Sequence, residues 1–214
     1  MNLIQKKHNI QNRVEPPIAE YFHGSKRFYD PKEKVTVIKI FSGDWYVSTS
    51  KDEMVSTILG SCVSACIRDP HIGVGGMNHF LLPGNETMDN KHSDAARYGI
   101  FAMECLINGI MKAGGNKERL EVKVFGGGNV THNSARIGSR NAEFIRDFLQ
   151  KEGLRKVSED LEGEHPRRVH YYPSTGKVMM RLLLRKDDLV VAQEEYFYER
   201  RIMNKPIAGD IELF

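Results

Sequence analysis

The chain has 214 residues, of which 40% are hydrophobic and 28% are charged. This composition is typical of a globular protein that is long enough to bury a full core. Its 31 basic and 28 acidic residues give a net charge of +3, and its basic residues cluster only in short pairs such as Arg167-Arg168 and Arg200-Arg201, so nucleic-acid binding is not indicated. No stretch approaches the roughly 18 apolar residues of a membrane helix, and no apolar run follows the N-terminal charges as in a secretory signal. We therefore expect a cytoplasmic protein without membrane insertion.

The three cysteines, Cys62, Cys66 and Cys105, are an odd number. An odd number in a cytoplasmic chain argues against a framework of disulfides. Buried thiols often act as small hydrophobic side chains. We expect packing roles for some of the three and chemistry for at least one.

The N-terminal part, residues 1–33, is polar and aperiodic, and Pro16-Pro17 interrupts it. It is interpreted as a partly disordered extension. Order is expected from Lys34, where β-branched and alternating residues predict a strand. Further strands are predicted from tight turns and apolar runs, so that the five expected strands cover residues 35–40, 45–48, 54–59, 62–67 and 73–82.

Two helices are predicted from apolar residues spaced three and four apart. The first is capped by Ser93 and ends at Gly114-Gly115. Its expected buried stripe includes Cys105, to which we assign a packing role, and runs through Ala95, Tyr98, Phe101, Ala102, Leu106, Gly109 and Ile110. The second is capped by Ser139, ends at Gly153, and buries Ala142, Ile145, Phe148 and Leu149.

The remaining segments are predicted mostly as strands, at residues 120–125, 168–172 and 177–184. The acidic residues between Glu159 and Glu164 are interpreted as a solvated loop, and residues 189–198 are ambiguous between strand and helix. Strands outnumber helices without regular alternation, which favours a layered α+β sandwich. We expect one domain over residues 34–200, with two main helices, followed by a tail over 201–214.

Cys62 is the candidate nucleophile. A thiol nucleophile needs small neighbours, a base within hydrogen-bond reach and donors for an oxyanion. Gly60 and Ser61 supply an open turn beside the thiol, and His79 is expected on an adjacent strand. A neighbouring imidazole favours the reactive thiolate, and a hydroxyl from Thr57 is a candidate to hold the ring.

Other interpretations stay open on these residues alone. Both Cys62 and His79 are consistent with ordinary core positions. A zinc site formed by Cys62, Cys66, His71 and His79 has an unusual spacing, because paired zinc cysteines generally flank a tight turn. The run Gly126-Gly127-Gly128 lacks the rest of either phosphate-binding motif, so it predicts a tight loop beside the cleft, where Asn129 and His132 either contact substrate or cap the loop.

Several motifs in one order give this chain a clear resemblance. It resembles the CheD family, the chemoreceptor glutamine deamidases of bacterial chemotaxis, over about residues 35–185. The motifs are residues 57–63, 75–83, 125–129, 137–141, 159–163 and 172–178.

The resemblance implies an α/β/β-layered sandwich and a catalytic triad. The triad maps to Cys62, His79 and Thr57, with Ser56 as the alternative third member. The residues expected to bind substrate are Gly60, Ser61, Asn78 and Asn129. No metal and no cofactor is implied.

The resemblance also implies a substrate and a partner. The substrate class is glutamine side chains on the cytoplasmic helices of methyl-accepting chemotaxis receptors, and a CheC-type phosphatase is a further expected partner. The alternative function is a non-catalytic adaptor that binds receptors or that phosphatase without turnover.

Overall fold

The computed structural model describes residues 26–82, 94–130 and 135–183. Its helices are α1 (Asp94–Lys112), α2 (Ala135–Lys151) and a short 3-10 helix, η2 (Lys117–Arg119). Its strands are β1 (Lys26–Asp30), β2 (Val35–Lys39), β3 (Trp45–Ser48), β4 (Glu53–Leu59), β5 (Val63–Asp69), β6 (Val74–Asn78), β7 (Glu121–Gly126), β8 (Arg155–Leu161), β9 (Arg167–Tyr172) and β10 (Lys177–Leu182).

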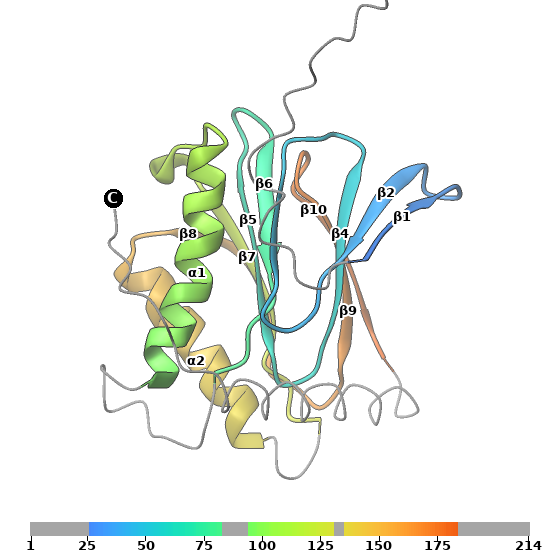
Figure 1. Cartoon of the computed structure of the whole chain (residues 1–214). Helices are drawn as coiled ribbons and strands as arrows, with labels where there is room; N and C mark the ends of the chain where they lie inside the picture. Colours follow the sequence, from blue (N-terminus) through green and yellow to red (C-terminus); the bar gives the residue numbers. More distant parts are fainter. Residues whose placement is uncertain (1–25, 83–93, 131–134, 184–214) are drawn as a thin grey trace, which may run out of the picture.

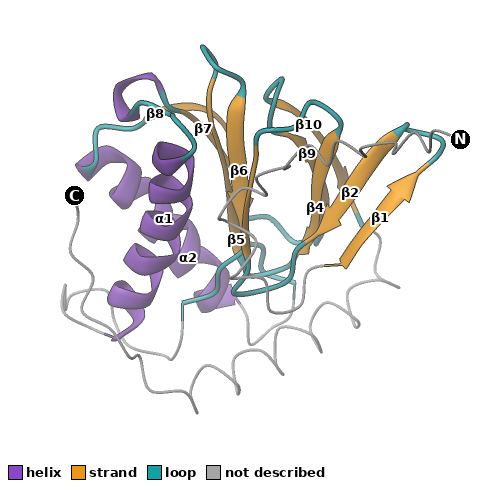
Figure 2. Ribbon diagram, turned by 45° about the horizontal axis from the view of Figure 1, so that its top comes forward, coloured by secondary structure: helices purple, strands orange, loops and turns teal. Residues whose placement is uncertain are grey.

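These elements form three layers (Figure 1). One five-stranded sheet has the order β1-β2-β4-β9-β10 and is called the outer sheet here; the other, with the order β3-β6-β5-β7-β8, is the central sheet. Helices α1 and α2 cover one face of the central sheet, and the outer sheet packs on its other face (Figure 2). The predicted α+β sandwich, with α/β/β layers and two main helices, is confirmed.

Alternation along β5 divides the interior into two cores. Val63, Ala65 and Ile67 belong to the core beneath the helices, whereas Cys62 and Cys66 belong to the core between the sheets. Successive side chains of a strand point to opposite faces, so the even-numbered positions face the outer sheet. The expected nucleophile therefore projects into the layer between the two sheets.

Two strands were not predicted, because their residues lack an apolar pattern. β1 starts at Lys26, inside the expected extension, and pairs with β2 through mostly exposed residues. β8 replaces the first part of the predicted acidic loop and pairs in parallel with β7. Both are edge strands. Edge strands bury few side chains, so composition alone gives them little hydrophobic signal.

The helices differ from the prediction in their details. α2 begins at Ala135, so Ser139 lies inside the helix and its predicted capping role is wrong. In α1, Ala95, Leu106 and Ile110 are buried as expected, but Phe101 is 42% exposed. Cys105 is only half-buried. The predictions at Ser93, at residues 189–198 and for the tail lie outside the described residues. None of the described helices is long and apolar enough to span a bilayer.

Candidate active site

The turn that carries Cys62 joins β4 of the outer sheet to β5 of the central sheet. It is buried and not open as expected, since Ser61 is 3% and Cys62 0% exposed. The glycine-rich segment after β7 is bonded to it along the backbone: Gly127 N–H donates to the Cys62 carbonyl over 2.7 Å, and Gly128 N–H donates to the Gly60 carbonyl over 2.7 Å. Gly126 has a φ of 115°, and a Cβ there would lie 2.1 Å from the Cys62 carbonyl oxygen. Only glycine fits this position, so the glycine-rich segment packs directly against the turn that carries Cys62 and holds it in place.

Two further side chains hold this turn and the glycine-rich segment beside it, and neither was predicted as a site residue. Asn141, from α2, donates its amide to the Ser61 carbonyl over 2.8 Å and accepts the Leu82 N–H over 3.0 Å. Arg167 donates to the Gly126 carbonyl over 3.1 Å. Asn141 falls within a motif of the resemblance, which is the signal that could have identified it. Arg167 was taken only as part of a short basic pair, although its side chain is 4% exposed.

His79 follows β6 directly and lies on the same face of the central sheet as Cys62. Val63 and Phe80 form an antiparallel bridge, with both backbone hydrogen bonds at 2.9 Å. In this register Cys62 and His79 are diagonal neighbours. Diagonal neighbours on one face lie about 7–8 Å apart at Cα, within reach of long or aromatic side chains.

The third predicted member, Thr57, reaches this histidine from the outer sheet. The Thr57 Oγ1 lies 2.8 Å from His79 Nδ1 and donates its hydrogen to the Ile40 carbonyl over 2.9 Å. Since a hydroxyl has one hydrogen to donate, Thr57 accepts from a protonated Nδ1. The alternative, Ser56, pairs with Lys39 and His170 and lies on the opposite face of β4. The geometry therefore favours Thr57 over Ser56 as the hydroxyl that contacts His79.

Burial keeps the His79 imidazole neutral. The ring is 6% exposed, and desolvation lowers the pKa of His79 from 6.5 to about 3. With Nδ1 protonated, Nε2 carries the free lone pair. This Nε2 is buried without a hydrogen-bond partner in the described part of the chain. A buried acceptor left unsatisfied is unusual, and it suits a base that waits for a proton.

The loop between β2 and β3, residues 40–44, contacts all three triad candidates and was not predicted. Its Ile40 carbonyl accepts from Thr57. Ser42 Oγ lies 3.6 Å from Cys62 Sγ, and Ser42 is buried. Gly43 N–H donates to the His79 carbonyl over 2.7 Å, and His79 N–H donates to the Asp44 carbonyl over 2.9 Å. The loop crosses from one sheet to the other, so it fixes their separation at the site.

The two predicted asparagines differ. Asn78 is 1% exposed, accepts the Ala65 N–H over 2.8 Å and donates to the Ala102 carbonyl over 3.0 Å. These bonds tie β5 and β6 to α1, so the structure gives Asn78 a structural role instead of substrate binding. Asn129, in contrast, has a buried Oδ1 with no partner among the described residues. Its backbone N–H donates to the Gly163 carbonyl over 2.7 Å, so the loop is fixed while the amide acceptor stays available.

The other thiols are poorly suited to nucleophilic chemistry. Burial raises the pKa of Cys66 well above its usual value, and burial together with Glu104 raises the pKa of Cys105 to about 11. Across residues 26–82, 94–130 and 135–183, no group of three or more His, Cys, Asp or Glu side chains is placed to hold a metal ion. The four residues of the alternative zinc site are therefore not brought together.

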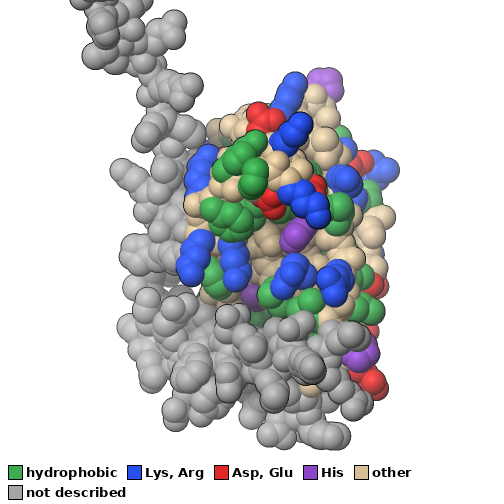
Figure 3. All heavy atoms as spheres, turned by 90° about the vertical axis from the view of Figure 1, so that its right-hand side faces the viewer, with side chains coloured by type: hydrophobic (Ala, Val, Ile, Leu, Met, Phe, Trp, Pro, Cys, Tyr) green, Lys and Arg blue, Asp and Glu red, His purple; other side chains and the backbone are tan. Residues whose placement is uncertain are grey.

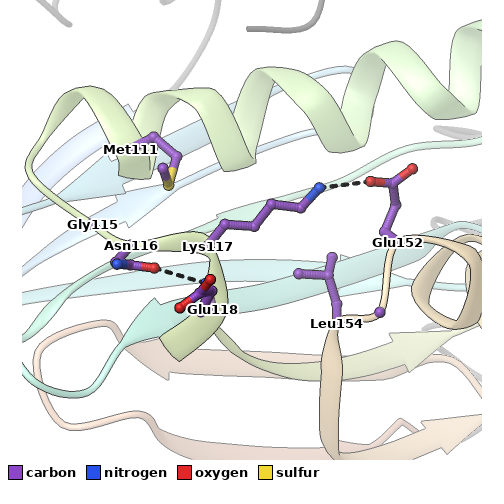
Figure 4. Close-up of a pocket in the computed structure, with 8 residues that line it drawn as sticks. Met111, Gly115, Asn116, Lys117, Glu118, Glu152 and Leu154 are labelled. Carbon is purple, nitrogen blue, oxygen red and sulfur yellow. Dashed lines mark hydrogen bonds and ion pairs between the residues drawn. The ribbon is translucent and has the colours of Figure 1, made fainter.

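A pocket of about 480 Å³ lies elsewhere, at the end of α1 and α2 (Figure 4). The Asn116 N–H beside it donates to Asp69, the last residue of β5. Cys62 precedes the first residue of β5, so the pocket is at the opposite end of the central sheet. It is lined by Met111, Gly115, Asn116, Lys117, Glu118, Glu152, Gly153 and Leu154.

Comparisons with known proteins agree with the motifs. A family model described as CheD chemotactic sensory transduction matches residues 81–182. A probable chemoreceptor glutamine deamidase CheD of Rhodopseudomonas palustris is 50% identical over 88% of this chain and 89% of that protein. The protein of the same name from Janthinobacterium is 48% identical over 87% of this chain and 93% of that protein. The namesake from Hahella chejuensis is 43% identical over the full length of both chains.

Proposed function

This chain belongs to the CheD family, and from that membership we propose that it is a chemoreceptor glutamine deamidase that uses Cys62 as its nucleophile. The reaction converts a glutamine side chain to glutamate and releases ammonia. The observation that carries the proposal is the Thr57–His79 contact of 2.8 Å, because it leaves His79 Nε2 unprotonated on the sheet face that carries Cys62. A non-catalytic adaptor would have no use for such a buried, unpartnered base.

The first step is activation of the thiol. His79 Nε2 takes the proton of Cys62, which leaves a thiolate and an imidazolium. Thr57 holds the ring by accepting from Nδ1. Ser42, whose Oγ lies 3.6 Å from the sulfur, donates its hydroxyl hydrogen to the thiolate and stabilises the charged state.

The thiolate then attacks Cδ of the substrate glutamine. A carbon–sulfur bond forms, and the carbonyl π electrons move to oxygen beside the turn at residues 60–62. The imidazolium returns its proton to the amide nitrogen, the C–N bond breaks, and ammonia leaves a thioester. Asn129 Oδ1, an unpartnered buried acceptor, is suited to receive an N–H of the substrate amide.

Water completes the cycle. Neutral His79 removes a proton from water as it attacks the thioester carbonyl, and the Cys62 thiolate leaves and is reprotonated. The product is a glutamate side chain, so each turnover adds one negative charge to the substrate. No step requires a group beyond the protein and water. Relatives that share up to 50% of their sequence with this chain are named probable chemoreceptor glutamine deamidases, and the substrate we propose is accordingly a receptor segment in the cytoplasm.

Mass spectrometry tests the proposal. A purified chemoreceptor cytoplasmic fragment incubated with the native protein should gain about one mass unit at each modified glutamine. Cys62→Ala should lower the rate by at least about 1000-fold, since loss of a catalytic nucleophile removes the covalent route. Cys105→Ala is the matched control, because Cys105 lies half-buried on α1, and it should keep the native rate. Turnover by Cys62→Ala at the native rate would contradict the proposal.

Alkylation separates the enzyme from the adaptor. Cys62 and Cys66 are equally buried, at 0% and 1% exposed, so iodoacetamide at neutral pH should modify Cys62 before Cys66 if a base activates the Cys62 thiol. An adaptor would show no preference for Cys62. The CheC-type phosphatase partner stays a prediction from the family.

A further inference from the structure

Four cations form two like-charge pairs across the outer sheet. Lys26 of β1 lies directly opposite Lys39 of β2, and Arg168 of β9 lies directly opposite Arg181 of β10. Like charges placed directly opposite on neighbouring strands are destabilising. Lys26, Lys39, Arg168 and Arg181 are called the basic band here.

All four side chains lie on one face. Lys39 is in register with Ser56 of β4, and Ile58, two residues further on, is in register with Arg168. Residues paired across strands share a face, as do residues two apart on one strand. This face is opposite to the one that carries Thr57, and so it points away from the central sheet. Figure 3 faces this side of the molecule and shows Lys and Arg side chains across it.

The four cations of the band are not paired with carboxylates of the described residues. None of its four members forms an ion pair within the described ranges, and Lys39 instead lies 5.0 Å from the Phe41 ring. Elsewhere arginines are neutralised, as in Arg119–Asp69 at 2.6 Å and Arg146–Glu159 at 3.1 Å.

The acidic residue nearest along β1 is at its other end. Asp30 shares the face of Lys26 but is four positions away, about 13 Å along a strand. Its carboxylate accepts from the backbone N–H groups of Lys32 and Glu33. Asp30 and Glu33 also interact electrostatically with His170, which shares the band's face two residues from Arg168. Four cations against these two carboxylates leave the surface with a net positive charge.

The band also lies at the active-site end of the sheet. Arg168 pairs with Ile58, which precedes the turn at residues 60–62 by only two positions. Exposed apolar side chains accompany it on the same face: Phe28 on β1 is 52% exposed, and Met179, two residues from Arg181 on β10, is 36% exposed. Unpaired cations beside exposed apolar residues are typical of a surface that binds a partner.

We propose that the basic band binds acidic side chains that flank the target glutamine in the substrate protein. This rests on the proposed function and names the substrate feature that the enzyme selects. The cations attract carboxylates that remain in solvent near the turn at residues 60–62, while the glutamine enters the site. Because each turnover creates a new carboxylate, a segment that has already been deamidated binds the band more tightly at its next glutamine.

Steady-state kinetics with two synthetic peptides test the inference. One peptide has a glutamine flanked by glutamates, and the other has the same sequence with serines in place of the glutamates. The native enzyme should show a lower KM for the glutamate-flanked peptide. Raising NaCl from about 50 to about 300 mM should remove most of that difference, because salt screens exposed charges.

The double variant Arg168→Thr/Arg181→Thr should raise KM for the glutamate-flanked peptide about 3- to 10-fold, the size expected from loss of two exposed ion pairs. Its kcat, and its KM for the serine-flanked peptide, should stay within twofold of native. The control Lys51→Thr/Lys112→Thr removes the same charge from exposed positions off this face and should leave both KM values unchanged.

Each result separates the inference from the function on which it rests. If the native enzyme deamidates neither peptide nor a receptor fragment, the proposed function itself fails. If it deamidates both peptides with equal KM, or if the control variant raises KM as much as the band variant, the inference fails alone. If the native protein shows equal KM values but sediments with vesicles containing phosphatidylserine, and the band variant does not, the band is a lipid site and the inference is overturned.

Discussion

Two buried titratable side chains, Asp69 and His79, lie at opposite ends of the β5–β6 pair and differ in how completely their polar atoms are hydrogen-bonded. Asp69 is 0% exposed. It accepts from Arg119 through both of its oxygens, with a shortest distance of 2.6 Å, and from the N–H groups of His71 and Asn116. The hydrogen bond from Arg119, the largest cause, holds the pKa of Asp69 at about 2. His79 keeps one ring nitrogen without any partner in the described part of the chain.

The difference distinguishes a structural group from a chemical one. A buried polar group that contributes to stability is satisfied, because an unmade hydrogen bond is unfavourable. Asp69 closes the end of β5 against η2 and the loop before it. His79 leaves a lone pair unsatisfied in a site where a proton acceptor is needed. Changes at Asp69 should therefore alter stability without altering chemistry, and changes at His79 should do the reverse.

The largest expected effect is at His79. His79→Gln keeps a side chain of similar size but removes the base, so the deamidation rate should fall by at least about 1000-fold. Denaturant unfolding should show stability equal to or above native, since the variant has no imidazole to keep neutral. A His79→Gln protein that unfolds readily, or that turns over at a tenth of the native rate, would contradict the distinction between a chemical His79 and a structural Asp69.

Asp69→Asn should have the opposite profile. The amide cannot accept from all its present donors, and its own N–H groups would face backbone donors, so the free energy of unfolding should fall by about 2 kcal/mol. The rate per folded molecule should stay native. Urea titration and a rate assay at low urea measure the two quantities.

The same pair gives a pH dependence. The folded-state pKa of Asp69, about 2, lies below its ordinary value of 3.8. Its stabilisation is therefore complete above about pH 4 and is lost as pH falls toward 2. The native protein should lose stability relative to Asp69→Asn over that interval. A stability difference that stays constant from pH 5 to about 2 would mean that Asp69 does not carry it.

Thr57→Val tests the support of the histidine. Valine matches the shape of threonine but cannot accept from Nδ1, so the ring loses its fixed tautomer. The rate should fall about 10- to 100-fold, less than for the base itself, because an orienting group acts through another residue. Thr57→Ser keeps the hydroxyl and should recover most of the rate. Equal activity of the valine and serine variants would show that the hydroxyl has no role.

The smallest expected effect is at Ser42. Ser42→Ala removes the hydroxyl 3.6 Å from the Cys62 sulfur, which should lower the rate about 3- to 10-fold and shift the pH profile of Cys62 alkylation upward, since a thiolate loses one donor. Ser48→Ala is the matched control: Ser48 is also buried, and its hydroxyl bonds Glu53 over 2.6 Å at the other end of β3 and β6. That variant should lose stability and keep the native alkylation profile.

The sequence predicted the parts of the site that depend on neighbouring strands. Cys62 and His79 follow from a small-residue turn and the next strand of the same sheet. Thr57 was chosen over Ser56 by resemblance, and the strand alternation of β4 now explains the choice. The loop at residues 40–44 was missed because its contacts depend on β2 and β3 belonging to different sheets, which no local pattern encodes.

The fold also separates into features that local patterns predict and features that they do not. The apolar face of α2 was predicted from its spacing, and Ala142, Ile145, Phe148 and Leu149 are all buried. Its start was placed at Ser139 because serine is a favoured cap, yet the helix extends back to Ala135. Asn78 was expected to bind substrate. Neighbours on a strand point to opposite faces, and Asn78 accordingly points toward α1.

The central claim is that His79 is neutral, protonated on Nδ1 and unprotonated on Nε2, and nitrogen NMR of the ring tests it most directly. With ¹⁵N-labelled histidine and assignment by His79→Gln, the native protein at neutral pH should show a protonated Nδ1 and a bare Nε2. The ring should remain neutral as pH is lowered toward 4, since the pKa is about 3. A charged imidazolium at neutral pH, or a proton on Nε2 in place of Nδ1, would contradict the account.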